Sequence, residues 1–423
     1  MGLHPSEILV GYEKAGKKAL QLLEDLVAYT VENLRDKNEL IKCLQSVVGS
    51  KHYGNQNILA PLIAEAALYA MPRTSRDFNV DNIRVQKVLG ASLQDSLVVH
   101  GMAVVRGSEN SINHVENAKI VVYNTPLELN TGDTKGTVLF TKAEDLENYS
   151  KGEENAMEKW IKELAEAGVN VVVTSGGISD MAHHFCEKYR IMLLKILSKF
   201  ETIRIAKAVG AKIVTKEACP SPEEFGHAAE VRCREVGSTK VTVFRRDEDE
   251  NKMATIILRG STNSMLDDSE RAIDDGVNTV KNITRDQRFC AGAGAAEIHL
   301  ASRLQTFAKS QPGLDQYAVE RFGQAFEIVP RVLAENAGHN AEEIIAKLYS
   351  DGARSPFIGI DVEDGKVKDM KEKEIYDSLE TKSWAIKLAM DAVITILRVD
   401  QIIMSKPSGG PKPRAPQAPD LDD

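Results

Sequence analysis

Cysteine is scarce in this chain of 423 residues, and no two cysteines are closely spaced. A disulfide framework or a tetrahedral zinc site needs paired or clustered cysteines, so an odd and dispersed set argues against both. Such a set is typical of reduced thiols, and we therefore expect a cytoplasmic protein. The five cysteines are Cys43, Cys186, Cys219, Cys233 and Cys290.

Aromatic residues, a basic excess and long apolar runs are also lacking. Aromatics make up 5% of the chain, which predicts aliphatic cores. Its 53 basic residues are outnumbered by 62 acidic ones, and the formal charge of −9 argues against nucleic acid and anionic membranes as partners. No apolar run approaches the ~20 residues of a spanning helix. The N-terminus also lacks the basic-then-apolar pattern of a secretory signal.

The pattern of apolar residues changes along the chain. Hydrophobic residues make up 43%, and the length suggests about two to four domains. Helical periodicity dominates residues 5–30 and 36–72, and again after Gly260. Between residues 97 and 247, β-branched runs alternate with helical stretches, which indicates a parallel-sheet α/β domain. We therefore predict an α+β multidomain fold in which an α/β domain is inserted into a discontinuous helical domain.

The same patterns place the individual elements. Short β-type runs occupy residues 82–90 and 96–105. Further strands are expected at 118–124, 136–140, 169–175, 191–196, 211–215, 240–244 and 254–260. Helices are expected at 154–168, 179–189, 199–210, 264–285, 294–309, 315–338, 341–350 and 381–397.

A glycine-rich turn precedes the helix expected at 294–309. Gly292 and Gly294 lie just before its apolar-periodic part. The N–H groups and positive dipole end of a helix N-terminus can bind a phosphate. Without a third glycine or a P-loop lysine, however, this spacing is most often a simple turn before a helix. Phosphate binding and a plain turn therefore both remain open at this stage.

Two aspartates have both a plain and a chemical interpretation. Asp275 projects away from the apolar stripe of its helix, as a solvated acid or as a general base that activates water. Asp377 precedes the last long helix, where an acid is usually a cap or a first-turn residue. The alternative for Asp377 is a contact with a sugar hydroxyl. The pattern alone favours the plain interpretation of each.

His183 and Cys186 have the spacing of two metal ligands on one helix face, but no third ligand is visible. We therefore predict no metal site from these residues. The sequence also lacks the G-x-S-x-G, H-E-x-x-H and kinase signatures.

Four longer segments occur in a fixed order along the chain. They are LRGSTNSMLDDSERAIDDGVNTV, GAGAAEI, AFEIVPRVLAENAG and VDQIIMSKPSGG. Together they resemble the group II chaperonins, the family of the eukaryotic cytosolic chaperonin and its archaeal relatives. The resemblance runs from residue 1 to about residue 412.

The resemblance implies a chaperonin fold of three domains, threaded as equatorial, intermediate, apical, intermediate and equatorial. This order agrees with the helical, α/β and helical pattern. It makes residues 1–24 the end of the first equatorial segment, 25–96 and 253–284 the intermediate domain, 97–252 the inserted α/β apical domain and 285–406 the second equatorial segment. Residues 407–423 are rich in proline and end in acidic residues, and this composition predicts a disordered tail.

The resemblance also implies ATP with Mg²⁺ as cofactor, and it assigns residue roles. Asp275 aligns with the aspartate that activates water for ATP hydrolysis. Gly292 and Gly294 match the loop that contacts the nucleotide, and Asp377 matches an aspartate that touches the nucleoside. Lys51 resembles the lysine of a nucleotide-sensing loop.

Ala293 stands where the family has the middle glycine of this loop, and Ala291 stands where it has a proline. The Cβ atom of Ala293 narrows the allowed φ range, so some loss of nucleotide affinity is expected.

The helix expected at 179–189 resembles the family's apical helix that grips unfolded polypeptide, and the resemblance gives this role to Met181, His184 and Lys188. Residues 141–160 resemble the protrusion that closes the folding chamber as a lid. The implied partners are other chaperonin subunits in a hetero-oligomeric double ring and unfolded clients of the actin and tubulin type.

One part of the family pattern has no counterpart in this sequence. The N-D-G-A-T and G-D-G-T loops, which cradle the phosphates and carry the magnesium-binding aspartate, do not occur. We therefore expect an N-terminally truncated subunit. The first hypothesis is a subunit of an ATP-driven folding machine. The alternatives are an ATPase-deficient polypeptide-binding module and a non-functional partial product.

Overall fold

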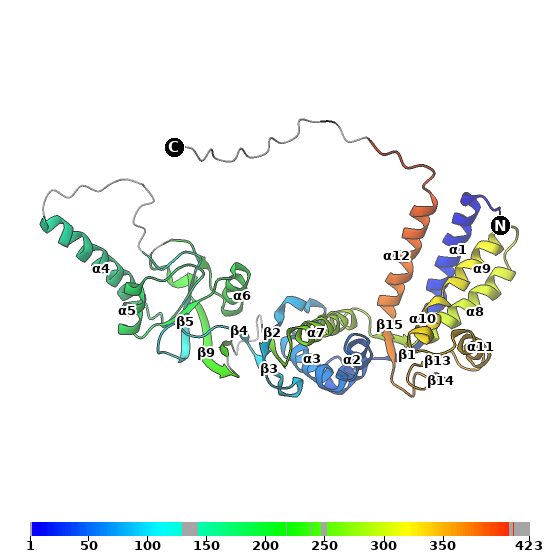
Figure 1. Cartoon of the computed structure of the whole chain (residues 1–423), viewed down its shortest axis with the longest axis horizontal. Coiled ribbons are helices and arrows are strands. Elements are labelled where there is room, and N and C mark those ends of the chain that lie inside the picture. The colour runs from blue at the N-terminus through cyan, green and yellow to red at the C-terminus, as the bar shows by residue number, and fades with distance from the viewer. Residues whose placement is uncertain are drawn as a thin grey trace, which may run out of the picture.

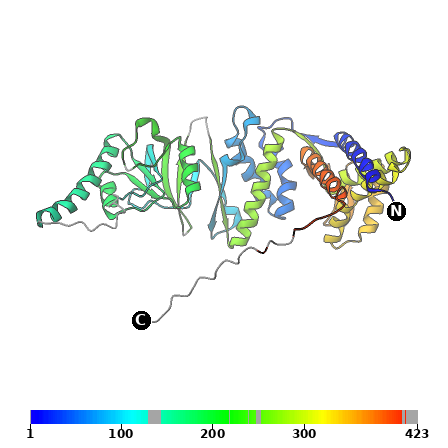
Figure 2. The same ribbon diagram turned by 90° about the horizontal axis from the view of Figure 1, so that it is seen from above.

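The computed structural model describes residues 2–128, 143–216, 218–237, 239–246, 252–405 and 409. Three groups of elements follow one another along an elongated molecule (Figure 1). A sheet with α4, α5 and α6 lies at one end, α2, α3 and α7 lie in the middle, and α1 lies with α8–α12 at the other end (Figures 1 and 2). Within the described residues, no helix is long and apolar enough to cross a membrane.

The helices are α1 (Pro5–Glu24), α2 (Lys37–Lys51), α3 (Gln56–Ala70), α4 (Ala143–Glu166), α5 (Asp180–Lys188), α6 (Lys199–Val209), α7 (Asn263–Ile283), α8 (Ala295–Lys309), α9 (Asp315–Ala325), α10 (Ile328–Asn336), α11 (Ala341–Gly352) and α12 (Leu379–Leu397). The strands are β1 (Val27–Thr30), β2 (Ile83–Leu89), β3 (Leu97–His100), β4 (Met102–Val104), β5 (His114–Tyr123), β6 (Val171–Thr174), β7 (Met192–Lys195), β8 (Ile213–Val214), β9 (Gly226–Val236), β10 (Thr239–Arg245), β11 (Ala254–Gly260), β12 (Arg288–Ala291), β13 (Ile358–Asp361), β14 (Lys366–Asp369) and β15 (Tyr376–Ser378).

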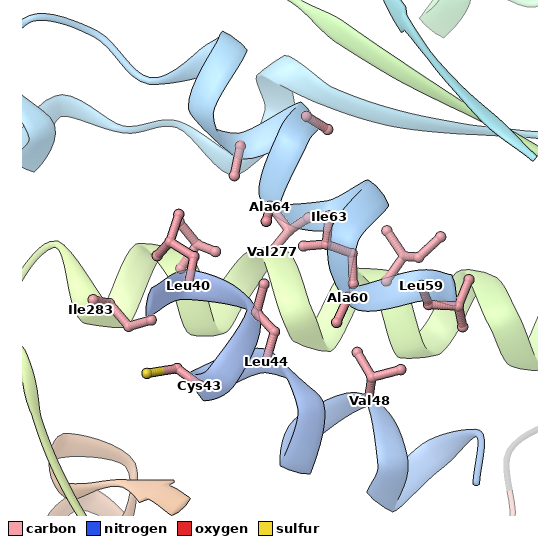
Figure 3. Packing of buried hydrophobic residues seen from close by; sticks show 14 of the residues in the cluster. Leu40, Cys43, Leu44, Val48, Leu59, Ala60, Ile63, Ala64, Val277 and Ile283 are labelled. Carbon is pink, nitrogen blue, oxygen red and sulfur yellow. The ribbon is translucent and has the colours of Figure 1, made fainter. Parts of the chain in front are cut away.

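The middle group packs α2, α3 and α7 beside a three-stranded sheet of order β2–β11–β3. Its core is aliphatic, as the low aromatic content predicts, with Leu44, Ile63 and Val277 meeting from the three helices (Figure 3). Gly276 allows this close approach, because a Cβ atom there would lie 2.7 Å from Ile63 Cδ1. The resulting packed group carries Lys51 at the end of α2 and Asp275 on α7.

The sheet at one end has the order β4–β10–β9–β5–β6–β7, with β8 also pairing with β5. The expectation of a parallel sheet is correct for only half of it: β5, β6, β7 and β8 pair in parallel, whereas β4, β10, β9 and β5 pair antiparallel. The antiparallel half arises because β9 and β10 form a hairpin with no helix between them. Alternate residues of β5 pack on opposite faces, Val122 toward α6 and Val121 toward α4 and α5.

The third group contains α1, α8–α12, a small sheet of order β1–β12–β15 and the hairpin β13–β14. The helix expected at 5–30 ends at Glu24, and Val27–Thr30 instead form β1, which pairs with β12. The helix expected at 315–338 is two helices, α9 and α10. Pro330 lies in the first turn of α10, where its missing N–H costs no helical hydrogen bond.

Candidate functional site

The glycine loop joins β12 to α8. Ala293 and Gly294 both have positive φ values, of 54° and 78°. This left-handed stretch turns the chain so that α8 begins directly after the loop, and Ile298 N–H donates to the Gly294 carbonyl as the helix starts. The expected turn before a helix is therefore present. The N-terminus of α8 offers the helix dipole and first-turn N–H groups to an anion.

Two neighbouring segments hold the loop in place. Gly292 N–H donates to the Ile375 carbonyl at 3.1 Å, and Ile360 N–H in β13 donates to the Ala293 carbonyl at 3.1 Å. Gly359 is a supporting residue that sequence reasoning missed, because a Cβ atom there would lie 2.9 Å from the Ala293 oxygen. A glycine inside a short apolar strand is the signal that could have found it.

Asp377 lies beside this loop. It is in β15, where it pairs with Cys290 of β12, and its Oδ2 lies 3.2 Å from the position of a Cβ atom on Gly292. Lys382 forms an ion pair with it, with 2.9 Å between Nζ and Oδ2. The interpretation of Asp377 as a helix cap is wrong, because Ser378 is the N-cap and accepts from Thr381 N–H. The structure thus brings Asp377 and the glycine loop together.

Asp275 and Lys51 form a second pair. Lys51 Nζ lies 3.5 Å from Asp275 Oδ2, and both side chains are about half exposed. Asp275 points away from the stripe of Ile273, Val277 and Val280, which is buried in the core of the middle group. The half-exposed carboxylate of Asp275 can accept a hydrogen bond from a water molecule, and the ammonium group of Lys51 can bind a phosphate.

Helix α2 connects the middle group to the strand that carries Asp377. Ser46 Oγ donates to the carbonyl of Tyr376, the residue before Asp377, at 2.5 Å. Lys42 of the same helix forms an ion pair at 2.7 Å with Glu374. Because α2 ends at Lys51, one helix contacts the segment beside the glycine loop and also carries the partner of Asp275.

A separate surface lies on α5. Ser179 caps this helix by accepting from Ala182 N–H, and Ala182, Phe185 and Cys186 form the buried face. Met181, His184 and Lys188 are exposed and share the opposite face through their spacing. Lys188 Nζ binds Glu158 of α4 at 2.6 Å, so the polar end of this surface is anchored.

His183 and Cys186, which have the spacing of two metal ligands, have different surroundings in the structure. His183 Nε2 lies 2.9 Å from the Glu109 carbonyl oxygen. Burial raises the pKa of the Cys186 thiol to about 12, which keeps it protonated. Among the described residues, no group of three or more His, Cys, Asp or Glu side chains is placed to hold a metal ion.

Some predicted features fall on residues that the structure does not describe. The strand expected at 136–140 and the tail at 407–423, apart from Gly409, lie outside the described residues. Of the lid segment at 141–160, the first two residues lie outside them, and the backbone from Ala143 belongs to α4.

Comparison with known proteins decides the family. The model of the TCP-1/cpn60 chaperonin family matches residues 1–407. This chain belongs to that family. This chain is 48% identical over 416 residues to T-complex protein 1 subunit theta of Gallus gallus, and the aligned region covers 98% of this chain and 76% of the relative. It is 43% identical to the protein of the same name in Dictyostelium discoideum, covering 100% and 79%.

A solved structure agrees with this assignment. The chaperonin is similar to the open-state monomer of a group II chaperonin from Methanococcoides burtonii, with a TM-score of 0.70 and 27% identity over 94% of each chain. The expected multidomain chaperonin fold is thereby confirmed.

Proposed function

We propose that this chain acts as a subunit of a cytosolic, ATP-dependent chaperonin that binds unfolded polypeptides and assists their folding in a ring of related subunits. Membership of the chaperonin family supports the folding function. The observation that carries the nucleotide part is the meeting of the glycine loop with Asp377, linked through α2 to the pair of Lys51 and Asp275. The further partners in this proposal are the other subunits of a hetero-oligomeric double ring.

The three groups of elements correspond in this proposal to the three family domains. The group of α2, α3 and α7 is the intermediate domain, the mixed sheet with α4–α6 is the apical domain, and the remaining group is equatorial. The first intermediate-to-apical boundary moves from residue 97 to about Gly101, because β3 pairs with β11 of the middle sheet. The other boundaries, after residues 24, 252, 284 and 406, are retained.

The charged and polar groups around the glycine loop determine the role that each residue has toward a nucleotide in this proposal. The N-terminus of α8 offers N–H groups to phosphate oxygens, and Asp377 offers a carboxylate to sugar hydroxyls. Asp275 accepts a proton from the attacking water, and the ammonium group of Lys51, which is paired with that carboxylate, meets the phosphate. The donor set for Mg²⁺ is incomplete in the described residues, so we assign no metal ligand and no step to the metal.

The client surface in this proposal is the exposed face of α5. Met181 supplies apolar contact, whereas His184 and Lys188 supply polar contact. A mixed face suits many partners, because it needs no single complementary shape.

Hydrolysis of ATP by the purified full chain tests the nucleotide part. Substitution of Asp275→Asn should lower kcat about 100-fold or more with little change in KM, because general-base catalysis contributes roughly this much. The matched control is Asp274→Asn. Asp274 is adjacent on α7, and burial and the nearby Glu270 carboxylate raise its pKa. Equal loss in both variants, or no loss in Asp275→Asn, contradicts the assignment.

A second function is favoured by one specific outcome of the same assay. If the wild-type chain captures unfolded polypeptide through α5 but hydrolyses no ATP, the chain is a binding module without turnover. Aggregation of the purified chain without capture would instead support the non-functional partial product.

A further inference from the structure

A buried ion cluster lies directly behind the glycine loop. Lys382, in the first turns of α12, has a side chain that is only 17% exposed and lies between two carboxylates. Its Nζ contacts Asp377 Oδ2 at 2.9 Å, and it also donates to Oε1 of Glu297. Burial of a lysine between two acids is costly unless the charges are well paired. The cluster therefore needs an explanation beyond packing.

Glu297 is the second carboxylate that contacts the Lys382 ammonium group, in addition to Asp377. It lies in the first turn of α8, immediately after the glycine loop, where the helix dipole favours a negative charge. Its Oε2 atom is buried and has no hydrogen-bond partner among the described residues. The contact with Lys382 is therefore the side-chain hydrogen bond that holds Glu297 in this buried position.

The lysine remains charged in this environment. Burial lowers the pKa of Lys382, but the carboxylates of Asp377 and Glu297 outweigh this effect and raise it above its ordinary value. A cation that stays charged at neutral pH keeps a permanent hold on the Asp377 carboxylate.

Asp377 keeps room for a ligand while it is held. Its side chain is 42% exposed, and a carboxylate can accept more hydrogen bonds than the one from Lys382. The strand pairing of Asp377 with Cys290 fixes its backbone, so the side-chain torsions are the remaining freedom. Lys382 removes that freedom by holding one oxygen from the buried side.

We propose that Lys382 is a positioning residue that aims the Asp377 carboxylate at the ribose hydroxyls of a nucleotide in the glycine loop, and that Glu297 holds Lys382 in place. This inference rests on the proposed function. Under this proposal, Lys382 acts through Asp377 and does not itself touch the nucleotide. The preference for a nucleotide with ribose hydroxyls over one without them therefore depends on Lys382. A merely structural role of Lys382 would weaken the binding of both nucleotides equally.

The test compares the binding of ATP and 2′,3′-dideoxy-ATP to the full chain by calorimetry. Wild type should prefer ATP by about tenfold or more, as expected for a hydrogen bond to a charged acceptor. Lys382→Met should bring this ratio close to one by weakening ATP binding, with little change for the dideoxy nucleotide. The control is Lys387→Met on the same helix. Lys387 Nζ lies over the Trp384 ring, 5.0 Å from its centroid, and this variant should keep the wild-type ratio.

The outcomes separate this inference from the function on which it rests. A wild-type chain that binds neither nucleotide overturns both proposals. A wild-type preference that persists in Lys382→Met, or an equal loss for both nucleotides, overturns the positioning role alone. If Lys382→Met does not fold, Lys382→Gln retains a neutral donor and should give an intermediate ratio. An unchanged ratio in that variant also overturns the positioning role.

Discussion

Ala293 adopts a backbone conformation that alanine rarely takes, with a φ of 54° in the middle of the glycine loop. The loop geometry overrides the preference of the residue because Gly292 and Ala293 are both fixed by backbone hydrogen bonds to neighbouring segments. The Cβ atom of Ala293 disfavours positive φ values, but the loop holds the residue at such a value. The cost is strain within the folded chain.

Ala293→Gly should therefore stabilise the protein. Removing the Cβ atom relieves left-handed strain, and the greater chain entropy of unfolded glycine offsets part of the gain. We expect the free energy of unfolding, measured in urea, to rise by about 0.5–1 kcal/mol. Ala295→Gly is the control, because Ala295 is buried in α8 with ordinary helical geometry. That change should be destabilising, and a loss of stability in Ala293→Gly would contradict the account.

At this scale, sequence reasoning found the residues with a local signature. Gly292 and Gly294 stand out from their spacing, whereas the roles of Asp275 and Asp377 rest on the family resemblance and remain predictions. Lys382 and Glu297 could not be found, because the contact joins residues 85 positions apart and exists only after folding. Their residue types are also ordinary on any helix.

The hairpin β13–β14 is the element that supports the glycine loop from the outside. Asp361, at the end of β13, is only 11% exposed and accepts from Lys368 Nζ at 2.6 Å. The hydrogen bond from Lys368 lowers the pKa of Asp361, and the N–H of Glu363 lowers it further, although burial opposes them. A lowered pKa means that the pair stabilises the fold above the unfolded-state pKa and loses this effect as the pH falls through the folded-state value.

Asp361→Asn should thus cost stability at neutral pH and much less in acid. We expect a loss of about 1–2 kcal/mol at pH 7 from chemical unfolding, as for other hydrogen bonds between charged groups. The difference from wild type should shrink as the pH falls below about 4. Asp364 also binds Lys368 but is 47% exposed, so Asp364→Asn should cost clearly less. A pH-independent loss in Asp361→Asn would contradict the ion pair as its cause.

Elements with a strong period were predictable, and elements defined by their partners were not. Helices α7 and α8 begin and end within two residues of the expected bounds, and β11 matches residues 254–260. Strand β9 was not expected, because charged residues interrupt the C-terminal half of its sequence, GHAAEVRCREV, and leave no apolar run. Strands β1, β12 and β15 are short, and their sheet forms by pairing of distant segments. The apolar content of these short segments alone does not show which distant segments will pair.

The whole molecule connects two surfaces through the middle group. The face of α5 lies in the group at one end, and the glycine loop with Asp377 lies in the group at the other end (Figure 1). Helices α2, α3 and α7 lie between them as one packed body. The contacts of Ser46 and Lys42 join this body to the segment beside the loop. Under the proposed function, nucleotide binding shifts this body and thereby changes access to α5.

Photo-crosslinking from α5 within the assembled ring tests this account most directly. A photoreactive residue replaces His184 on the exposed face of α5, and as control it replaces Lys207, which is exposed on α6 across the sheet. We expect crosslinks to a chemically denatured globular protein from position 184 and few from position 207. Addition of ATP should markedly decrease the crosslinks from position 184. Equal crosslinking from both positions, or crosslinking at position 184 that ATP leaves unchanged, would contradict a chaperonin subunit that couples nucleotide to client binding.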